Sequence, residues 1–224
     1  MVFRDRQEAG RLLAERLAGL RESLPVVLGL PRGGVPVAFE IAQALRAPLD
    51  VLLVRKIGVP WQPELALGAI SDGEEPELFI DEQLKTLLEI DEEYIADARK
   101  RAIAEIERRR TEFRAGQPAI DVSGRVAIVV DDGIATGATT RVALRALRRR
   151  KPSRVILAVP VAPPDSLAGL RSEADEIVCL EKPEDMGAVG LYYRDFRQTT
   201  DQEVTDLLAR ARRDLAGAPA PERK

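Results

Sequence analysis

Residues 126–140 read VAIVVDDGIATGATT and combine an apolar run, two acids and a turn of small residues. The five apolar residues Val126 to Val130 are typical of a strand that is buried on both faces of a parallel sheet. Asp131 and Asp132 follow directly, and adjacent carboxylates at the end of a buried strand are unfavourable unless a cationic or polyhydroxylated ligand meets them. We therefore expect a ligand site where this strand ends.

The turn that follows is suited to an anion. Small residues and hydroxyls lead into a helix that should begin near residue 138, so several backbone N–H groups and the positive end of the helix dipole point to one place. A phosphate at the turn and hydroxyls at the two acids together describe a sugar phosphate. The alternative, acids that cap a helix and threonines that fill a turn, fits poorly with two acids after an apolar strand. The turn residues are Ala135, Thr136, Gly137, Ala138, Thr139 and Thr140.

The remaining pattern is that of an α/β protein. Short apolar runs alternate with helical periodicity, which predicts an open, mostly parallel twisted sheet flanked by helices. We expect one domain over residues 1–216, a long helix over 82–115 and a disordered tail over 217–224. Further strands are expected at 26–30, 50–54, 154–159 and 176–180, a hairpin at 66–71 and 77–80 around Asp72-Gly73, and helices at 4–20, 35–46, 138–149, 164–174 and 200–215.

Composition excludes several kinds of chemistry. The chain of 224 residues has no histidine and one cysteine, so Ser-His or Cys-His pairs, histidine-bearing zinc sites and an intrachain disulfide are excluded. A net charge of −3 argues against a dedicated nucleic-acid or membrane-surface protein. No apolar run is long enough to cross a membrane and no leader segment is evident. We expect a cytoplasmic protein whose partners are small molecules.

Residues 126–140 closely resemble the signature for 5-phosphoribosyl 1-diphosphate (PRPP) in type I phosphoribosyltransferases, and the resemblance extends over most of residues 8–200. PRGGVP, LLVRKIGVP and MGAVGLYY resemble one uncharacterised branch of that family. The resemblance implies a parallel α/β core with a small hood over the site. It also implies that Asp131 and Asp132 hold the ribose hydroxyls, that Ala135 to Thr140 hold the 5′-phosphate, and that Mg²⁺ binds with the donor.

Two basic segments fit the same resemblance. Arg32, Gly33 and Gly34 follow the first strand, where the family has its diphosphate loop; glycine allows close backbone approach and arginine adds a forked cation. Arg55 and Lys56 end the second strand, as a basic pair does in orotate-specific members. The alternatives are an ordinary turn with a solvated arginine and two surface cations whose alkyl stems pack on the core.

Other segments depart from the family or are less informative. The expected mobile loop, Ile57 to Leu67, carries Glu64 as its only charge, and this residue is either an acid/base or lid residue or a surface carboxylate. Ala135 stands where hypoxanthine and guanine enzymes have an acid. The 82–115 helix is an insertion relative to the shortest members of the family, so no role can be carried over to it. A hood is expected at about 183–200 with the N-terminal segment, where Tyr192 and Tyr193 either stack on a base or pack a flap.

The expected activity is transfer of the phosphoribosyl group from PRPP to a nitrogenous base, with release of diphosphate, in nucleotide salvage or related metabolism. Asp131, Asp132 and Glu64 are the candidate catalytic residues, and the two aspartates would meet Mg²⁺ indirectly, through the donor. The alternative is a PRPP- or nucleotide-sensing regulator with little catalysis, which the uncharged lid and the missing acid favour. A homodimer is compatible with the sequence.

Overall fold

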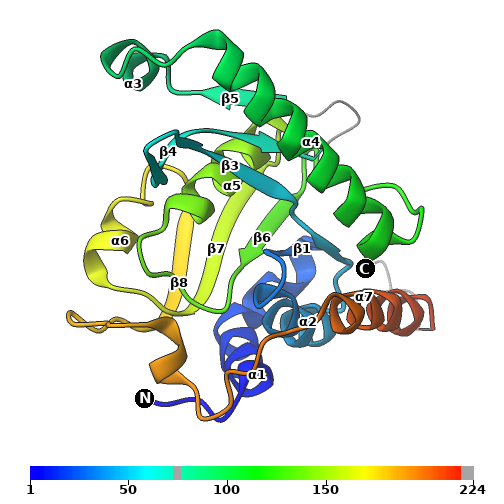
Figure 1. Cartoon of the computed structure of the whole chain (residues 1–224). Helices are drawn as coiled ribbons and strands as arrows, with labels where there is room; N and C mark the ends of the chain where they lie inside the picture. Colours follow the sequence, from blue (N-terminus) through cyan, green and yellow to red (C-terminus); the bar gives the residue numbers. More distant parts are fainter. Residues whose placement is uncertain (73–76, 218–224) are drawn as a thin grey trace.

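The computed structural model describes residues 1–72 and 77–217. Its centre is a parallel five-stranded sheet in the order β2-β1-β6-β7-β8 (Figure 1). The expected α/β fold with a mostly parallel sheet is therefore confirmed. The strands are β1 (Val26–Gly29), β2 (Leu49–Val51), β6 (Val126–Val130), β7 (Arg154–Val161) and β8 (Glu176–Glu181).

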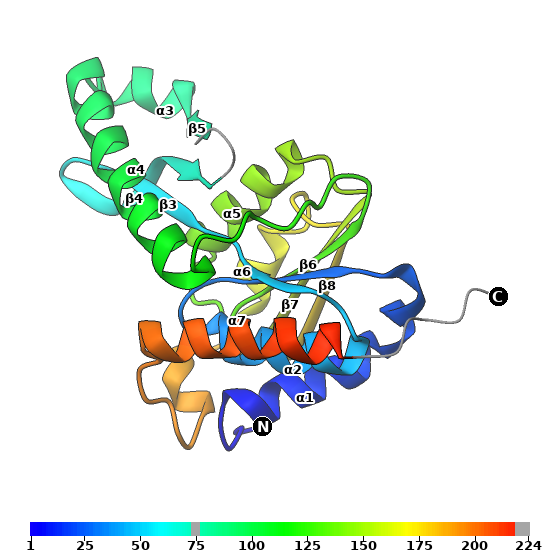
Figure 2. The same cartoon turned by 90° about the vertical axis from the view of Figure 1, so that its right-hand side faces the viewer.

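Helices cover both faces of this sheet, because alternate strand residues face opposite sides. Val27, Ile128 and Ile156 belong to the core beneath α1, α2 and α7, whereas Leu28 and Val129 belong to the core beneath α5 and α6. Figure 2 shows the first three helices as one layer below the sheet. The helices that cover the two faces are α1 (Arg6–Leu17), α2 (Gly34–Leu45) and α7 (Asp201–Ala216) on one, and α5 (Ala138–Arg149) and α6 (Pro164–Ala168) on the other. A 3₁₀ helix, η1 (Ala18–Ser23), follows α1.

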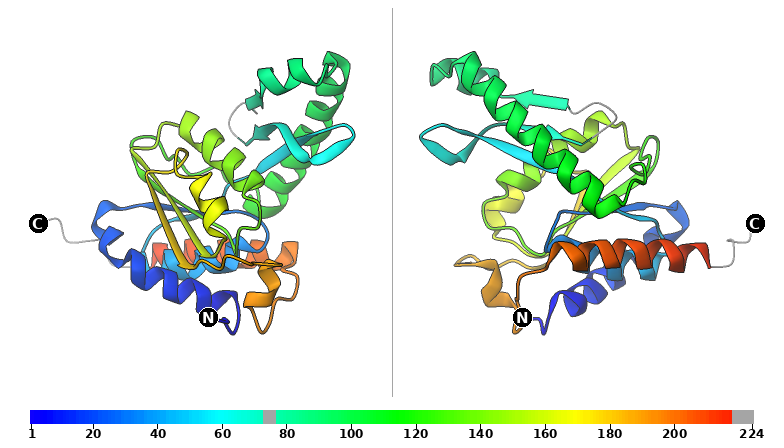
Figure 3. Two further views of the ribbon diagram at one scale, coloured as in Figure 1. Left: turned by 90° about the vertical axis from the view of Figure 1, so that its left-hand side faces the viewer. Right: turned by 45° about the vertical axis from the view of Figure 1, so that its right-hand side comes forward.

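A second, antiparallel sheet contains β3 (Val54–Val59), β4 (Gln62–Ser71) and β5 (Glu77–Ile80). With α3 (Glu82–Leu87) and α4 (Glu92–Arg114) it forms an arm that projects from the parallel sheet (Figure 3). The expected pairing of 66–71 with 77–80 is confirmed, since Gly68 faces Ile80 across β4 and β5. Gly73 of the expected turn lies outside the described residues.

Three expected elements differ from the structure. The strand expected at 50–54 ends at Val51, and Val54 already belongs to the second sheet. The expected loop of Ile57 to Leu67 is mostly the β3–β4 hairpin, in which Val59 pairs with Gln62. Helix 164–174 stops at Ala168.

The single helix expected over 82–115 is two helices. Glu89 has a positive φ of 49°, and Asp91 starts α4 by accepting hydrogen bonds from the amides of Glu93 and Tyr94. A capping aspartate begins a new helix because it satisfies amides that would otherwise have no acceptor. The break is a local signal, yet the apolar spacing continues across it, and spacing alone predicted one helix.

The N-terminal segment lies beside residues 192–195. Phe3 forms a parallel bridge with Tyr193, and its amide donates to the carbonyl of Tyr192 at 2.8 Å. A short 3₁₀ helix, η2 (Val189–Tyr192), precedes this contact. These are the two segments expected to form the hood, and its action as a hood stays a prediction. Residues 218–224 of the expected tail lie outside the described part.

Within the described residues, no helix combines the length and the apolar character needed to cross a membrane.

Candidate active site

The two acids lie at the carboxyl end of β6, the middle strand of the parallel sheet. The loop that contains Arg32 follows the neighbouring strand β1, so the sheet order brings these two predicted segments together. The amide of Leu30 donates to the carbonyl of Val130 at 2.8 Å, which continues the pairing to the end of both strands. Ligands of open α/β sheets bind at this edge, outside the carboxyl ends of the strands.

Gly33 and Gly34 allow the loop to touch the acid pair. A Cβ at Gly33 would lie 1.9 Å from Oδ2 of Asp132, and a Cβ at Gly34 would lie 2.5 Å from the carbonyl oxygen of Val130. Any side chain would therefore force the two loops apart. The peptide bond between Pro31 and Arg32 is cis. Arg32 forms an ion pair with Asp201 at the start of α7, at 3.6 Å.

Arg6 is a site residue that the sequence reasoning missed. Its Nε donates to Oδ2 of Asp132 at 2.8 Å, and the two side chains are 11% and 15% exposed. The guanidinium also lies 4.0 Å from the ring centre of Phe196 and donates to the carbonyl of Arg197 at 2.8 Å. Arg6 therefore joins the N-terminal helix, the 193–197 segment and the acid pair. It lies 126 positions from Asp132, so no local spacing could have indicated the pair.

Asp131 is the less compensated of the two acids. One oxygen of its carboxylate accepts the amide of Asp132 at 2.9 Å. Burial, and then the negative charge of Asp132, raise the pKa of Asp131 well above the ordinary aspartate range. A carboxyl whose pKa is raised in this way at the end of a strand is a candidate ligand-binding residue.

The expected phosphate turn leads into α5 as predicted. Gly137 is the N-cap of this helix with φ of +76°, a left-handed conformation that favours glycine. The amide of Arg141 donates to the carbonyl of Gly137, so the amides of Ala138 to Thr140 precede the intrahelical bonds. Ala135 and Thr136 are exposed, and the carbonyl of Ala135 accepts from Ser166 at 2.6 Å. The turn can thus offer amides and hydroxyls to an anion.

Arg55 and Lys56 lie on β3, where the exposed Arg55 pairs with Ile70 and Lys56 with Ala69. Arg55 lines a small cavity with Pro31 and Thr139, so it lies near both loops. Glu64 lies in β4 but is not paired with Arg55 or Lys56, and its side chain is not among those described. The structure therefore brings Arg55 to the candidate site, whereas Lys56 follows it on β3 and the Glu64 carboxylate is not described.

Tyr192 and Tyr193 occupy different environments. Tyr193 is 6% exposed, its ring stacks on Phe196 with centres 5.0 Å apart, and its hydroxyl donates to the carbonyl of Asp132 at 2.6 Å. Both its ring and its hydroxyl are thus used in packing behind the acid pair. Of the two roles considered for Tyr193, this position fits the packing of a flap, because a buried ring has no free face for a base. Tyr192 is partly exposed.

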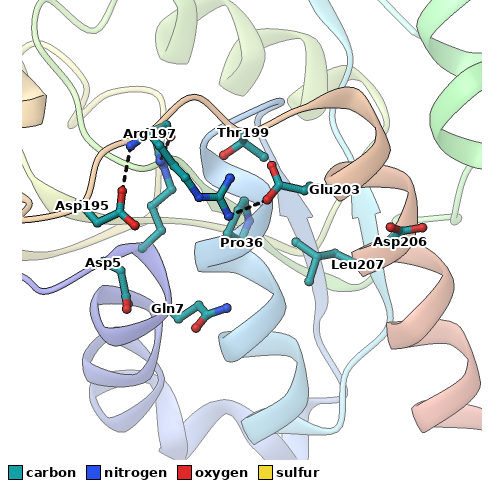
Figure 4. Close-up of a pocket in the computed structure, with 10 residues that line it drawn as sticks. Asp5, Gln7, Pro36, Asp195, Arg197, Thr199, Glu203, Asp206 and Leu207 are labelled. Carbon is teal, nitrogen blue, oxygen red and sulfur yellow. Dashed lines mark hydrogen bonds and ion pairs between the residues drawn. The ribbon is translucent and has the colours of Figure 1, made fainter.

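A pocket of about 300 Å³, which Arg6 helps to line, lies between the N-terminal ends of α1, α2 and α7 (Figure 4). Arg197 crosses it, with its amide donating to Asp195 and its guanidinium paired with Glu203 at 2.6 Å. Asp5 caps α1 by accepting the amide of Glu8. Asp5, Asp195 and Glu203 each have a partner within the protein in this pocket.

The donor set suits Mg²⁺ that arrives with a phosphorylated ligand. Carboxylate oxygens such as those of Asp131 and Asp132 are ligands that Mg²⁺ prefers, together with phosphate oxygens and water. Within the described residues, no group of three acidic or thiol side chains could hold a metal ion alone.

The parallel sheet carries an acid pair and a turn of small residues at its carboxyl edge, an arrangement compatible with a phosphoribosyltransferase-type domain. The comparison with known families agrees: the phosphoribosyl transferase domain family matches residues 5–196, and the chain belongs to it.

The chain is also similar to individual proteins of known sequence or structure. It is 49% identical over 219 residues to a protein of Mycobacterium tuberculosis named "Putative phosphoribosyl transferase". The matched region covers 98% of this chain and 49% of that protein. The chain thus spans about half the length of the curated relatives it matches. The crystal structure of TT1426 from Thermus thermophilus is 45% identical, with a TM-score of 0.83 over 94% of this chain and 99% of that one. A protein of Aquifex aeolicus, AQ2163, is 14% identical with a TM-score of 0.51 over 91% and 83% of the two chains, and it shares the fold.

Proposed function

We propose that this chain transfers the 5-phosphoribosyl group from PRPP to a nitrogenous base and releases diphosphate. The observation that carries the proposal is the contact between the acid pair at the end of β6 and the Arg32–Gly34 loop at the end of β1, with the α5 turn after the acids. Each segment suits a different part of a phosphoribosyl donor. Nucleotide salvage or related metabolism is the proposed setting.

The chain's own groups would act by holding the two ends of the donor. Asp131 and Asp132 would accept hydrogen bonds from the ribose hydroxyls, and residues 135–140 would donate to the 5′-phosphate. No protein nucleophile is required, because the bond from the anomeric carbon to the diphosphate can break through an oxocarbenium-like state. Arg32, Arg55 and Lys56 would stabilise the negative charge that develops on the leaving diphosphate. When bound with the donor, Mg²⁺ would supply further neutralisation of phosphate charge.

Arg6 would act on the acid pair through its ion pair with Asp132. Because its guanidinium pairs with Asp132 at 2.8 Å, Arg6 would orient this carboxylate for a ligand. The base would lie towards residues 183–200, where the partly exposed Tyr192 is the aromatic candidate for stacking. Ala135 offers no acid that could protonate a purine, and Glu64 stays a proposed acid/base or lid residue.

A second candidate function is a PRPP or nucleotide sensor that binds without turnover. The alanine at position 135 and the absence of basic residues from the Ile57–Leu67 segment favour it, since the leaving group would then receive less help. The sensor would use the same acid pair and turn. It differs from the enzyme in the fate of the bound donor.

The experiment that separates the two is diphosphate release from PRPP and Mg²⁺ across a panel of purines, pyrimidines and pyridine carboxylates. The enzyme predicts release with at least one base, lost in the Asp131→Asn/Asp132→Asn variant and retained in Asp97→Asn, an exposed acid on α4. Donor binding without release for every base would support the sensor and contradict the enzyme. Absence of both binding and release would contradict the two proposals together.

A further inference from the structure

The inserted helix α4 ends at a fixed place beside the parallel sheet. Figure 2 shows it running along β3 and β4 towards α7, with which it is in contact. Arg114 in its last turn is 1% exposed; its Nε lies 2.9 Å from Asp50 of β2 and its Nη2 donates to the carbonyl of Val51 at 3.0 Å. Asp72 also pairs with it. The C-terminal turns of α4 are therefore held rigidly next to the end of β2.

One helical turn before this anchor, α4 reaches the candidate site. Ile106 and Arg109 line a small cavity together with Pro31, Arg55 and Thr139. Pro31 starts the loop after β1, Arg55 belongs to β3, and Thr139 is in the first turn of α5. The insertion thus brings a guanidinium to the place where three predicted anion-binding segments meet.

Arg109 is oriented by its own helix. Its Nε donates to Glu105 at 2.7 Å, and Arg108 binds the same carboxylate at 3.0 Å. The hydrogen bond from Arg108, followed by that from Arg109, lowers the pKa of Glu105 to about 2, so this carboxylate stays charged. Among the described residues, Glu105 is the ion-pair partner of the Arg109 side chain, which is 24% exposed. Its two terminal nitrogens remain for a ligand.

We infer that Arg109 binds the diphosphate end of the donor, which makes the inserted helix part of the substrate site. The inference rests on the proposed function. The described residues that line the cavity are mostly apolar, and the two charged ones, Arg55 and Arg109, are both cations. Two guanidiniums beside the Pro31–Gly34 loop suit an anion with many oxygens, because each can donate two parallel hydrogen bonds. Diphosphate has more charge and more acceptors than the 5′-phosphate, which the amides of the α5 turn already suit.

The test is calorimetric titration of the full chain and of Arg109→Ala with three ligands: Mg²⁺-PRPP, Mg²⁺-diphosphate and ribose 5-phosphate. We expect Arg109→Ala to bind PRPP and diphosphate about 10- to 100-fold more weakly, since a hydrogen bond between charged groups is lost. Binding of ribose 5-phosphate should change less than twofold. Arg110→Ala is the matched control, because Arg110 pairs with Glu107 on the same helix. Arg109→Lys keeps the positive charge but not the forked guanidinium. Its affinity for PRPP and diphosphate should lie between those of the wild type and Arg109→Ala.

The outcomes separate this inference from the proposed function. Unchanged diphosphate affinity in Arg109→Ala, or an equal loss for ribose 5-phosphate, would overturn the role of Arg109 while PRPP binding by the wild type still supported the proposed function. Failure of the wild type to bind any of the three ligands would overturn the proposed function itself. Thermal melting checks each variant for folding, and if the alanine variant does not fold, Arg109→Lys and Arg109→Gln carry the same comparison.

Discussion

At the scale of single residues, the acid pair has opposite requirements for stability and for binding. Asp132 has Arg6 as its partner, whereas Asp131 is partly buried beside a like charge and its pKa is raised. A folded pKa above the unfolded one means that the native state binds the proton more tightly. The stability from this protonation is present below the ordinary aspartate range and is lost as the pH rises through the folded pKa.

We therefore expect Asp131→Asn to be more stable than the wild type at pH 7. The asparagine keeps an oxygen for the amide of Asp132 and removes the buried charge. The melting temperature should rise by a few degrees, since about 1 kcal/mol corresponds to roughly 2–4 °C for a chain of this size. The gain should shrink towards zero near pH 4, in the ordinary aspartate range.

Melting curves of both proteins between pH 4 and pH 8 measure this difference. Asp97→Asn, at an exposed position of α4, should melt like the wild type throughout. A lower melting temperature for Asp131→Asn at pH 7 would show that its charge stabilises the fold and would contradict the assignment.

Gly137 is the residue where backbone conformation matters most for the turn. Its φ of +76° costs a residue with a Cβ about 1–2 kcal/mol, and that Cβ would lie 3.3 Å from the buried Leu170. Gly137→Val should therefore lose binding of ribose 5-phosphate and also some stability. Thr136→Ala should be milder, because one hydroxyl is lost at about 0.5–1.5 kcal/mol, or roughly 2- to 12-fold in affinity.

Titration with ribose 5-phosphate, on samples that circular dichroism shows to be folded, gives the order of the two variants. Thr136 is exposed, so its replacement should leave stability within about 0.5 kcal/mol of the wild type. Binding by Gly137→Val that equals the wild type would place the phosphate elsewhere.

At the scale of elements, the sequence predicted the parallel sheet better than the arm. Runs such as Val126–Val130 are apolar throughout because both faces are covered, and this signal is local. The β3–β4 hairpin depends on pairing that shifts register at Gly58, and α3 and α4 are separated by a cap. Neither a bulged hairpin nor a helix break changes the apolar pattern enough to be inferred from it.

The arm is joined to the sheet by Arg114, so this residue should be costly to replace. Arg114→Met leaves Asp50 and Asp72 buried at 2% and 3% exposure without their cation. We expect a loss of about 3–5 kcal/mol in the free energy of unfolding, the cost typical of breaking a buried ion pair on one side. Urea unfolding measures it.

Two further variants sharpen this test. Arg110→Met, on the more exposed side of the same helix, should change stability by no more than about 0.5 kcal/mol. Adding Asp50→Asn and Asp72→Asn to Arg114→Met should recover part of the loss, because the uncompensated charges are removed. A loss below about 1 kcal/mol for Arg114→Met alone would mean that the arm is held by other contacts.

At the scale of the whole molecule, the site is assembled from segments far apart in the chain. The acid pair, the α5 turn and the Arg32–Gly34 loop could be predicted because each carries its own local signal. Arg6 and Arg109 could not, since their roles depend on a partner or a cavity that the tertiary structure creates. Tyr193 shows the reverse case: an aromatic that looked available for a base is buried by Phe3 and Phe196.

The central claim is that the carboxyl edge of this sheet binds a phosphoribosyl donor through Asp131 and Asp132. Calorimetric titration with PRPP in the presence of Mg²⁺ tests it most directly. The account predicts binding at one site per chain. It also predicts a loss of affinity on the order of 10²-fold in Asp131→Asn/Asp132→Asn, from about 1.5–3 kcal/mol for each hydrogen bond to a charged group. A double variant that is folded and binds PRPP as tightly as the wild type would contradict the claim.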